Sequence, residues 1–434
     1  MTFPKILIIS HNALSMHTNN GKTLYSLFKD WPSENIAQFY FHNEAPESDK
    51  FSSFFRVTDI DIVKVLFGRR KKSNCGEIIE KKVSDSTSNH KKSTISVFLN
   101  LLLKNCPFIV TLLRNILYQT KLWNSALFSN WCKNFKPEGV FFLGGNYKFS
   151  FDIAVFLSNK YKIPLYIYIT DDYILNNANS LILLNSQRNN LIKTYKKSFN
   201  IAKNVFVIGD MMASEFRLFF NRDFIPIMNI IEIDKYNIKT DNKKETNNIT
   251  ITYIGGLHLN RWKQIIEFGE LIKRIEADSN YKIKVEIYSF EIPPKQIYQK
   301  LSKHPLYFCG SLFGEKVIEK LNNSDILLHV ESEEKKYRQL TKLSVSTKIS
   351  EYLASNKCII GFGPSEVASM KFISDNNIGI TITDNMTIDE KINTIKTVIV
   401  NKQLREEYGK RAFSFAQNTL DAVVVRKKFL TNFL

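Results

Sequence analysis

Glycines followed by basic side chains occur in the second half of the chain, at a spacing that suits a phosphate. A predicted strand over residues 249–254 leads into Gly255 and Gly256, and Arg261 and Lys263 follow at the predicted start of a helix. Free amides at a helix N-terminus and positively charged side chains both bind phosphate oxygens. These four residues therefore predict a phosphate-binding site at the end of a strand.

A second group of polar residues opens another predicted helix, about ninety residues later. The hydroxyl of Ser346 or Thr347 can accept from free helix amides and cap this helix. Lys348 adds a positive charge to the first turn, where the helix dipole also favours an anion. Glu351 lies one turn further on and could hold sugar hydroxyls. The group suits a phosphate contact, and the alternative is an ordinary capped surface helix whose Lys348 and Glu351 lie in solvent.

Two adjacent carboxylates, Asp171 and Asp172, end a predicted strand that begins at residue 164. The carboxyl ends of strands are where α/β proteins bind their ligands. Successive side chains on a strand point to opposite faces, so we expect at most one of the two to face a site. Which one does so stays open, and capping of the following helix by either is the alternative.

The first predicted strand, residues 5–10, runs into a polar loop over residues 11–23 and then a helix from Leu24. This loop ends in Gly21, Lys22 and Thr23, which match the Gly-Lys-Thr end of the P-loop that binds nucleoside triphosphates. That motif requires a glycine five residues before Gly21, where this chain has Met16. The loop therefore does not predict a nucleoside triphosphatase, and a plain strand-to-helix connection is the simplest alternative.

The elements that carry these residues alternate between strand and helix along the whole chain. This alternation predicts parallel, doubly wound sheets, and 434 residues suit two such domains. We expect a first domain over residues 1–230 and a linker over 231–248. A second domain over 249–412 and a final helix over 413–434 that crosses back to the first domain complete the expected arrangement.

The net charge of +18 predicts an anionic partner. No zinc-finger spacing or RNA-binding aromatic motif accompanies it, so we expect phosphates and an anionic membrane rather than nucleic acid. A basic and apolar region over residues 64–123 predicts contact with a membrane surface, because its apolar runs are too short to span one. The alternative is a solvated loop beside core helices. Five scattered cysteines and the absence of a secretory signal predict a cytoplasmic protein.

Residues 346–354 read Ser-x-Lys-x-x-Glu-Tyr-Leu-Ala, and they precede an Asn-Lys turn and a strand that ends in Gly363-Pro364. This string resembles the donor-binding element of the GT-B glycosyltransferases. It is most similar to the large retaining bacterial family four, the capsular and exopolysaccharide type. The resemblance is weaker, but continuous in order, over most of the chain.

The resemblance implies an α/β chain of GT-B type, with two Rossmann-like domains facing a cleft. In that family an arginine and often a lysine after the Gly-Gly-Leu segment bind the donor diphosphate, which matches Arg261 and Lys263. The first loop, here with Gly21 and Lys22, closes over the donor phosphates. The glycine loop at Gly310 borders the nucleotide base, and a carboxylate near Asp171 and Asp172 faces the reacting sugar or the acceptor.

One position departs from the family pattern. Many retaining relatives have two glutamates separated by seven residues, the second at the position of Glu351. The position of the first is occupied by Leu343. Glu331, Glu333 or Glu334 could take its place in space, and the sequence does not say which.

These observations predict a metal-independent, retaining glycosyltransferase that uses no cofactor. It takes a nucleoside-diphosphate sugar, expected to be UDP-linked, as its donor. The acceptor is a glycan or lipid-linked glycan in cell-surface polysaccharide synthesis, and the protein is expected at the inner face of the cell membrane. Two alternatives stay open, namely a nucleotide-sugar epimerase of the same fold and a non-catalytic partner subunit of a glycosyltransferase.

Overall fold

The computed structural model describes residues 3–16, 19–79, 107–175, 182–236 and 247–433. These residues form two compact units, each with its own parallel sheet. Residues 80–106 of the predicted membrane-contact region and residues 237–246 of the predicted linker lie outside the described part. The chain passes into the second unit after Val207, returns at Ala213, and enters it again at Pro226.

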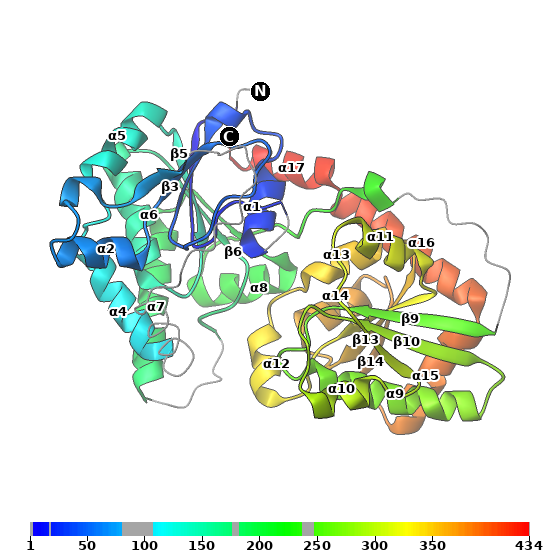
Figure 1. Cartoon of the computed structure of the whole chain (residues 1–434). Helices are drawn as coiled ribbons and strands as arrows, with labels where there is room; N and C mark the ends of the chain where they lie inside the picture. The colour runs from blue at the N-terminus through cyan, green and yellow to red at the C-terminus, as the bar shows by residue number, and fades with distance from the viewer. Residues whose placement is uncertain (1–2, 17–18, 80–106, 176–181, 237–246, 434) are drawn as a thin grey trace. The chain divides into compact units, whose positions relative to one another are not determined.

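The first unit is built on an eight-stranded sheet in the order β4-β3-β2-β1-β5-β6-β7-β8 (Figure 1). Its strands are β1 (Ile6–Ser10), β2 (Ile36–Tyr40), β3 (Ser53–Arg56), β4 (Glu77–Ile79), β5 (Gly139–Gly144), β6 (Leu165–Ile169), β7 (Asn204–Val207) and β8 (Ile225–Pro226). The pairings from β3 through β7 are parallel, and β4 is antiparallel to β3. Every residue of β1, β2, β5 and β6 is buried, as expected for strands covered on both faces.

Helices connect these strands and cover the sheet. They are α1 (Asn19–Phe28), α2 (Asp59–Leu66), α4 (Pro107–Gln119), α5 (Ala126–Phe135), α6 (Lys148–Tyr161), α7 (Ile182–Ile201) and α8 (Gly209–Phe220). Helix α1 begins five residues before Leu24, so Gly21 and Lys22 lie in its first turn and not in the predicted loop. The backbone of α1 can start this early because Gly21 has no side chain. A Cβ atom there would lie 2.2 Å from the carbonyl oxygen of Ala13.

The second unit is built on a six-stranded sheet in the order β11-β10-β9-β12-β13-β14, in which each pairing is parallel. Its strands are β9 (Asn248–Ile254), β10 (Lys282–Tyr288), β11 (Leu306–Gly310), β12 (Ile326–Val330), β13 (Cys358–Gly363) and β14 (Ile380–Thr383). Its helices are α9 (Arg261–Ala277), α10 (Lys295–Leu301), α11 (Glu315–Asn323), α12 (Lys335–Thr341), α13 (Thr347–Ala354), α14 (Ala368–Asp375), α15 (Ile388–Val400), α16 (Lys402–Thr419) and α17 (Ala422–Thr431).

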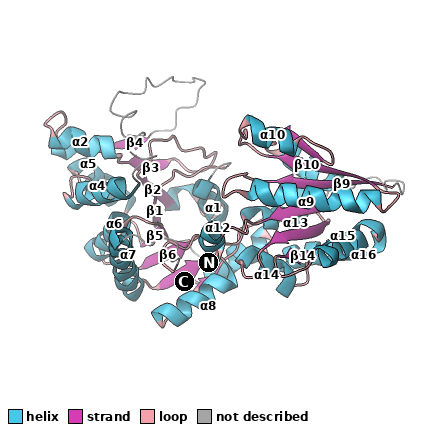
Figure 2. Ribbon diagram, turned by 90° about the horizontal axis from the view of Figure 1, so that it is seen from below, coloured by secondary structure: helices cyan, strands magenta, loops and turns pink. Residues whose placement is uncertain are grey.

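Two apolar cores lie on opposite faces of this second sheet, because successive strand residues point to opposite sides. Ile326 and Leu328 of β12 pack in one core with α9, α10 and α15. Leu327, between them, packs in the other core with α11, α13, α14 and α16. Figure 2 shows the two layers of helices around the sheet. This doubly wound arrangement confirms the predicted fold class.

The C-terminal segment corrects the prediction of a single helix over residues 413–434. Helix α16 ends at Thr419 and α17 starts at Ala422. The break is held by Ile231, whose N–H donates to the carbonyl of Leu420 (3.0 Å) and whose carbonyl accepts from Ala422 (2.9 Å). After α17, Phe433 groups with the first unit and stacks on Tyr166, with ring centroids 4.0 Å apart.

Among the helices of the described residues, none is both long enough and apolar enough to cross a membrane.

Candidate functional site

Charged side chains meet at the carboxyl edge of the second sheet. Strands β9 and β12 are neighbours, so the loop after β9 lies beside the residues that follow β12. Arg261, the first residue of α9, donates from Nη2 to Oε2 of Glu331 at 3.0 Å. Glu331, directly after β12, is 1% exposed. The predicted Arg261 therefore forms an ion pair with a buried carboxylate at the edge where α/β proteins bind ligands.

Glu331 is ionised despite its burial. Burial acts to raise the pKa of its carboxyl group, but the Arg261 guanidinium and a hydrogen bond from His329 outweigh this and hold the pKa at about 2. His329 is also buried, and its Nε2 lies 3.1 Å from Oε1 of Glu331. For Arg261, burial acts to lower the pKa, and the charge of Glu331 more than compensates and raises it. Both groups of the pair are therefore charged at neutral pH.

The guanidinium of Arg261 has donors left over. It carries five N–H groups, and Glu331 accepts from Nη2 alone. The buried Nε has no hydrogen-bond partner among the described residues. Nη1 is 3.5 Å from Nε2 of His258, which is at the limit of a hydrogen bond. A buried donor without a partner is costly, so Arg261 can donate to an oxygen atom of a ligand at this edge.

The other predicted residues of this loop have different surroundings. Gly255 and Gly256 follow β9, and the N–H of Gly255 donates to the carbonyl of Tyr288 at 3.0 Å.

Lys263 is 46% exposed and forms an ion pair with Glu334. Glu334 also accepts two hydrogen bonds from the amide nitrogen of Asn260, at 3.0 and 3.1 Å. Lys263 thus helps to fix the loop, and its ammonium group is not buried as Arg261 is.

Sequence reasoning missed His258, which lies in the same loop. Its Nδ1 is 2.6 Å from Oε1 of Glu291, and its Nε2 is the atom that approaches Arg261. The sequence offered one signal for it. The histidine lies two residues after the glycine pair and three residues before the predicted phosphate-binding arginine. The partner Glu291 gave none, because it belongs to a loop that only the pairing of β9 with β10 brings close.

Helix α13 begins as the sequence indicates. Ser346 is the N-cap, and its hydroxyl accepts from the N–H of Lys348 at 3.4 Å. Thr347 is the first helical residue and is exposed. The ammonium group of Lys348 lies 2.9 Å from Oε2 of Glu351 on the same helix. The charges of these two predicted residues therefore compensate each other in this structure.

Close packing explains a glycine of the string that resembles the donor-binding element. Gly363 ends β13, next to β12, and a Cβ atom there would lie 2.8 Å from the carbonyl oxygen of Glu331.

Tyr352 fixes α13 to the end of β9, because its hydroxyl accepts from the N–H of Ile254 at 2.8 Å. Gly310 ends β11 with φ of +80°, a conformation that glycine adopts without strain.

In the first unit the two adjacent aspartates have different environments. Asp172 is buried, and its Oδ1 accepts from the N–H groups of Ile174 (2.9 Å) and Leu175 (2.8 Å). It therefore fixes the turn after β6. Asp171 is partly exposed and accepts from the hydroxyl groups of Thr170 and Tyr173 at 3.2 and 3.4 Å. Of the two, Asp171 has the carboxylate that solvent or a ligand can reach.

The first sheet also has a histidine at its carboxyl edge that sequence reasoning did not single out. His11 follows β1, and its ring lies 4.7 Å from Tyr147 and 5.5 Å from Phe41. Its buried Nε2 has no hydrogen-bond partner among the described residues. Burial, and secondly the charge of Arg114, lower its pKa well below the ordinary value. His11 is therefore a neutral imidazole in an aromatic setting.

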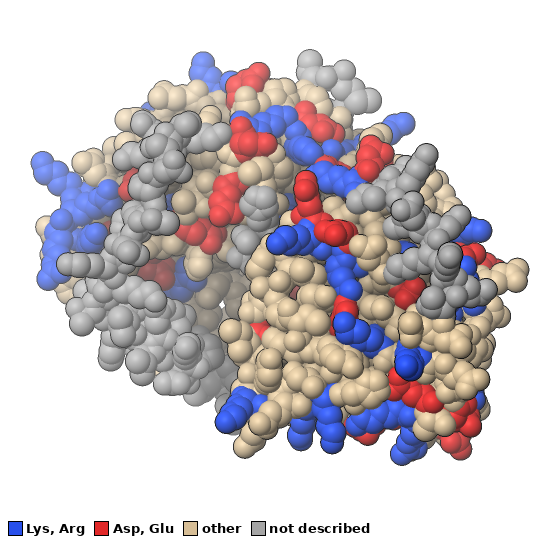
Figure 3. All heavy atoms as spheres, turned by 45° about the vertical axis from the view of Figure 1, so that its right-hand side comes forward, with Lys and Arg blue, Asp and Glu red and all other residues tan. Residues whose placement is uncertain are grey.

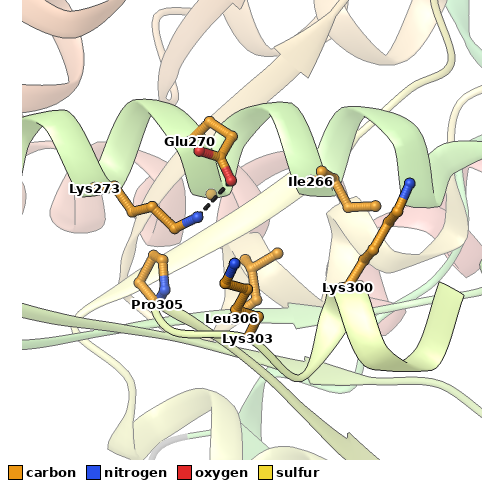
Figure 4. Close-up of a pocket in the computed structure, with 8 residues that line it drawn as sticks. Ile266, Glu270, Lys273, Lys300, Lys303, Pro305 and Leu306 are labelled. Atoms are coloured by element: carbon orange, nitrogen blue, oxygen red, sulfur yellow. Dashed lines mark hydrogen bonds and ion pairs between the residues drawn. The ribbon is translucent and has the colours of Figure 1, made fainter. Parts of the chain in front are cut away.

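A crevice of about 220 Å³ lies elsewhere in the second unit, between α9, α10 and the start of β11 (Figure 4). Lys273, Lys300 and Lys303 surround it, and Lys273 is paired with Glu270. Leu306, in its wall, is the first residue of β11, so the crevice belongs to the amino edge of the sheet. It is therefore separate from the group around Arg261.

Comparison with known proteins agrees with the architecture. The crystal structure of TarM matches 100% of this chain over 99% of its own, with a TM-score of 0.61 and 13% identity. WaaG, a glycosyltransferase involved in lipopolysaccharide biosynthesis, covers 98% of both chains with a TM-score of 0.52 and 12% identity. The chain has the GT-B fold. A trehalose-6-phosphate protein from E. coli bound with UDP-2-fluoro glucose has the same fold, with 98% of both chains covered, a TM-score of 0.58 and 10% identity.

One family matches part of the sequence. Residues 266–407 match the family described as Glucosyltransferase 3-like, C-terminal domain. No curated protein matches the chain. The family match and the GT-B fold together support a glycosyltransferase.

Proposed function

We propose that this chain transfers a sugar from a nucleoside-diphosphate sugar, with UDP as the nucleotide, to a glycan or lipid-linked glycan. The observation that carries the proposal is the guanidinium of Arg261, whose buried Nε has no partner among the described residues, at the carboxyl edge of the second sheet. A donor sugar leaves behind a diphosphate anion. Fixed donors in a water-poor site stabilise such a developing charge strongly.

We assign roles to the other residues that their positions support. The N-terminus of α13, with Ser346 as cap and Lys348 in its first turn, offers a second contact to the donor, and Glu351 binds donor hydroxyls. Lys263 keeps the loop before α9 in place through Glu334. In the first unit, Asp171 is the carboxylate for the acceptor or the reacting sugar, and Asp172 holds the turn beside it.

The nature of donor and acceptor is supported by the similar folds. One of them is bound with UDP-2-fluoro glucose, and another is involved in lipopolysaccharide biosynthesis. We accordingly propose UDP as the nucleotide and a lipid-linked precursor of a capsule or exopolysaccharide as the acceptor. Arg261 supplies the positive charge at the diphosphate in place of a metal. Transfer with retention is proposed on the resemblance of residues 346–354 to the retaining family.

Calorimetric titration with UDP, GDP and ADP, with and without Mg²⁺, tests the donor site. We expect one of them, UDP, to bind with micromolar affinity independently of Mg²⁺. Arg261→Lys keeps a positive charge but loses the planar fork, and we expect it to weaken binding about tenfold or more. Lys273→Ala, on the outer part of the same helix α9, is the matched control and should bind as the unmodified protein does.

Activity assays separate this proposal from its alternatives. We expect Arg261→Ala to lower kcat/KM by about 10²-fold or more, as for other lost donors to a developing anion. Near-normal activity of Arg261→Ala would contradict the assigned site. An epimerase would isomerise the sugar nucleotide without any acceptor. A non-catalytic subunit would show no turnover alone, and the anomeric configuration of the product, measured by NMR, decides retention.

We further propose that the protein binds an anionic membrane surface through α2 and α4 of the first unit. These helices lie side by side, and Arg114 of α4 pairs with Asp59 of α2 at 3.0 Å (Figure 1). Four apolar side chains of α4 at helical spacing are 44–55% exposed, namely Ile109, Leu112, Leu113 and Ile116. Leu66 and Phe67, at the end of α2, are 52% and 76% exposed.

Basic residues flank this apolar face. Arg69, Lys71 and Lys72 follow α2 and are exposed. An exposed apolar helix face beside basic side chains is typical of a helix that lies in the headgroup region of anionic lipids. On the face drawn in Figure 3, basic and acidic side chains of the second unit are interspersed, so that face offers no comparable surface of one charge.

Flotation with vesicles of phosphatidylglycerol and phosphatidylcholine tests the membrane contact. We expect binding to the mixed vesicles, weaker binding to phosphatidylcholine alone, and loss of binding in Leu112→Glu/Ile116→Glu. Leu218→Glu, at a side chain 83% exposed on α8, is the control and should bind normally. Unchanged binding of the α4 variant would refute the assigned surface.

A further inference from the structure

The loop between β9 and α9 adopts a strained conformation. Leu259 and Asn260 have φ of +58° and +57°. A positive φ is uncommon for residues other than glycine, and for a bulky side chain such as that of Leu259 it is an outlier. Trp262 and Glu334 hold the loop in this form through hydrogen bonds to the side chain of Asn260. Strain of this kind persists where the surrounding structure enforces it, and it is frequent at functional sites.

The strained turn brings two particular side chains together. The N–H of Arg261 donates to the carbonyl of His258 at 3.4 Å, which closes the turn. As a result Nε2 of His258 lies 3.5 Å from Nη1 of Arg261. The imidazole of His258 therefore lies next to the guanidinium of Arg261 at the carboxyl edge of the sheet.

The position of the imidazole is fixed from its other side. Nδ1 of His258 lies 2.6 Å from Oε1 of Glu291. A carboxylate can only accept, so Nδ1 carries the proton in this pair and Nε2 is the atom turned toward Arg261. The ring also needs Gly256, because a Cβ atom there would lie 2.3 Å from the imidazole and 3.0 Å from Oε1 of Glu291. One of the two glycines thus makes room for this histidine.

We propose that His258, oriented by Glu291, is a further residue that contacts the donor diphosphate beside Arg261. The inference rests on the proposed function, since it requires that Arg261 binds this diphosphate. In its imidazolium form His258 donates from Nδ1 to Glu291 and from Nε2 to a phosphate oxygen. When the bond between the sugar and the diphosphate breaks, the electron pair goes to the diphosphate oxygen, and the hydrogen bond from Nε2 strengthens with the charge.

An exposed histidine paired with a carboxylate is by itself ordinary. The second unit contains another such pair, in which Nε2 of His304 lies 2.8 Å from Oε2 of Glu276. The two histidine side chains are similarly exposed, at 54% for His258 and 60% for His304. His304 lies just before β11, at the amino edge of the sheet. The approach to a buried, partly unpartnered arginine distinguishes His258 and makes His304 a matched control.

Titration with UDP and UMP tests the contact to the second phosphate. We expect His258→Leu to weaken UDP binding about tenfold or more, as for loss of a charge-assisted hydrogen bond, and to leave UMP binding unchanged. His258→Gln, whose amide nitrogen can take the place of Nε2, should recover part of the UDP affinity. His304→Leu should bind both nucleotides as the unmodified protein does.

The outcomes separate this inference from the function on which it rests. If the unmodified protein binds none of UDP, GDP and ADP, the proposed donor site is wrong and the inference falls with it. If UDP binds and Arg261→Lys weakens it while His258→Leu does not, only the role of His258 is overturned. If His258→Leu weakens UDP and UMP equally, His258 merely supports the loop, which also overturns the proposal.

Discussion

We expect the ion pair between Arg261 and Glu331 to stabilise the second unit against unfolding. This expectation can be checked without a substrate. The glutamate side chain is buried, with 2% of it exposed, and the arginine side chain is largely covered, with 14% exposed. Replacing Arg261 by Met removes the charge and the hydrogen bond and leaves the aliphatic part of the side chain in place. Glu331 then remains as a buried carboxylate with only His329 beside it.

The cost of losing Arg261 follows from the burial of Glu331. Arg261 and His329 together hold the pKa of Glu331 at about 2, against an ordinary value of 4.5. This direction shows that the two partners more than offset the effect of burial on the carboxylate. Removing one partner of a buried pair costs about 3–5 kcal/mol in other proteins. We therefore expect Arg261→Met to destabilise the second unit by about 3 kcal/mol at pH 7.

The effect of pH has a defined sign. The pKa of Glu331 is lower in the folded state than in the unfolded state, so the stabilisation is fully present above about pH 4.5 and is lost as the pH falls toward about 2. In the double variant Arg261→Met/Glu331→Leu the buried carboxylate is also removed, and replacements of whole ion pairs are often close to neutral. The remaining cost is the hydrogen bond that His329 makes to Glu331. We expect the double variant to be more stable than Arg261→Met by about 2 kcal/mol or more.

Hydrogen exchange measured by mass spectrometry is the suitable assay, because the two units need not unfold together. Peptides that cover β9 and β12 report on the second unit alone. Lys273→Met, which breaks the exposed pair with Glu270 on the same helix, is the matched control and should change the stability by less than about 1 kcal/mol. If Arg261→Met changes protection in β9 and β12 no more than this control, the reasoning about a buried charged pair is refuted.

Two further predictions concern single polar groups. Tyr352→Phe removes the hydroxyl that accepts from the buried N–H of Ile254. We expect the second unit to lose about 1–3 kcal/mol of stability, measured by hydrogen exchange in β9. An unchanged exchange rate would mean that another group takes over this N–H. In an NMR titration of the histidine rings, we expect His11 to protonate well below the ordinary pKa because it is buried, and His42 above it because of its hydrogen bond to Glu44. The reverse order would show that the aromatic setting of His11 is not formed in solution.

Local sequence patterns determined most of the elements and the fold class. Unbroken apolar runs predicted the central strands, because strands of a parallel sheet are buried on both faces. Ser346 or Thr347 could be placed at a helix start because capping depends only on residues close in sequence. The glycine pair followed by Arg261 could likewise be read from one continuous stretch.

The pairing of distant residues was decided by the tertiary structure alone. Glu331 was one of three glutamates that could replace the missing first glutamate of the family pattern, and nothing in the sequence paired it with Arg261. Only the neighbourhood of β9 and β12 brings these two residues together. Glu291 reaches His258 because β10 lies on the other side of β9. The break after Thr419 depends on hydrogen bonds to Ile231, almost two hundred residues earlier.

The physical reason for this division is the range of the interactions. Hydrophobic periodicity and helix capping act over a few residues, so the sequence by itself determined the doubly wound sheets and the loop that carries Arg261. Burial and charge pairing depend on which strands become neighbours. The structure alone therefore decided that the Nε of Arg261 is buried, that Glu331 holds one of its donors, and that His258 lies beside the others.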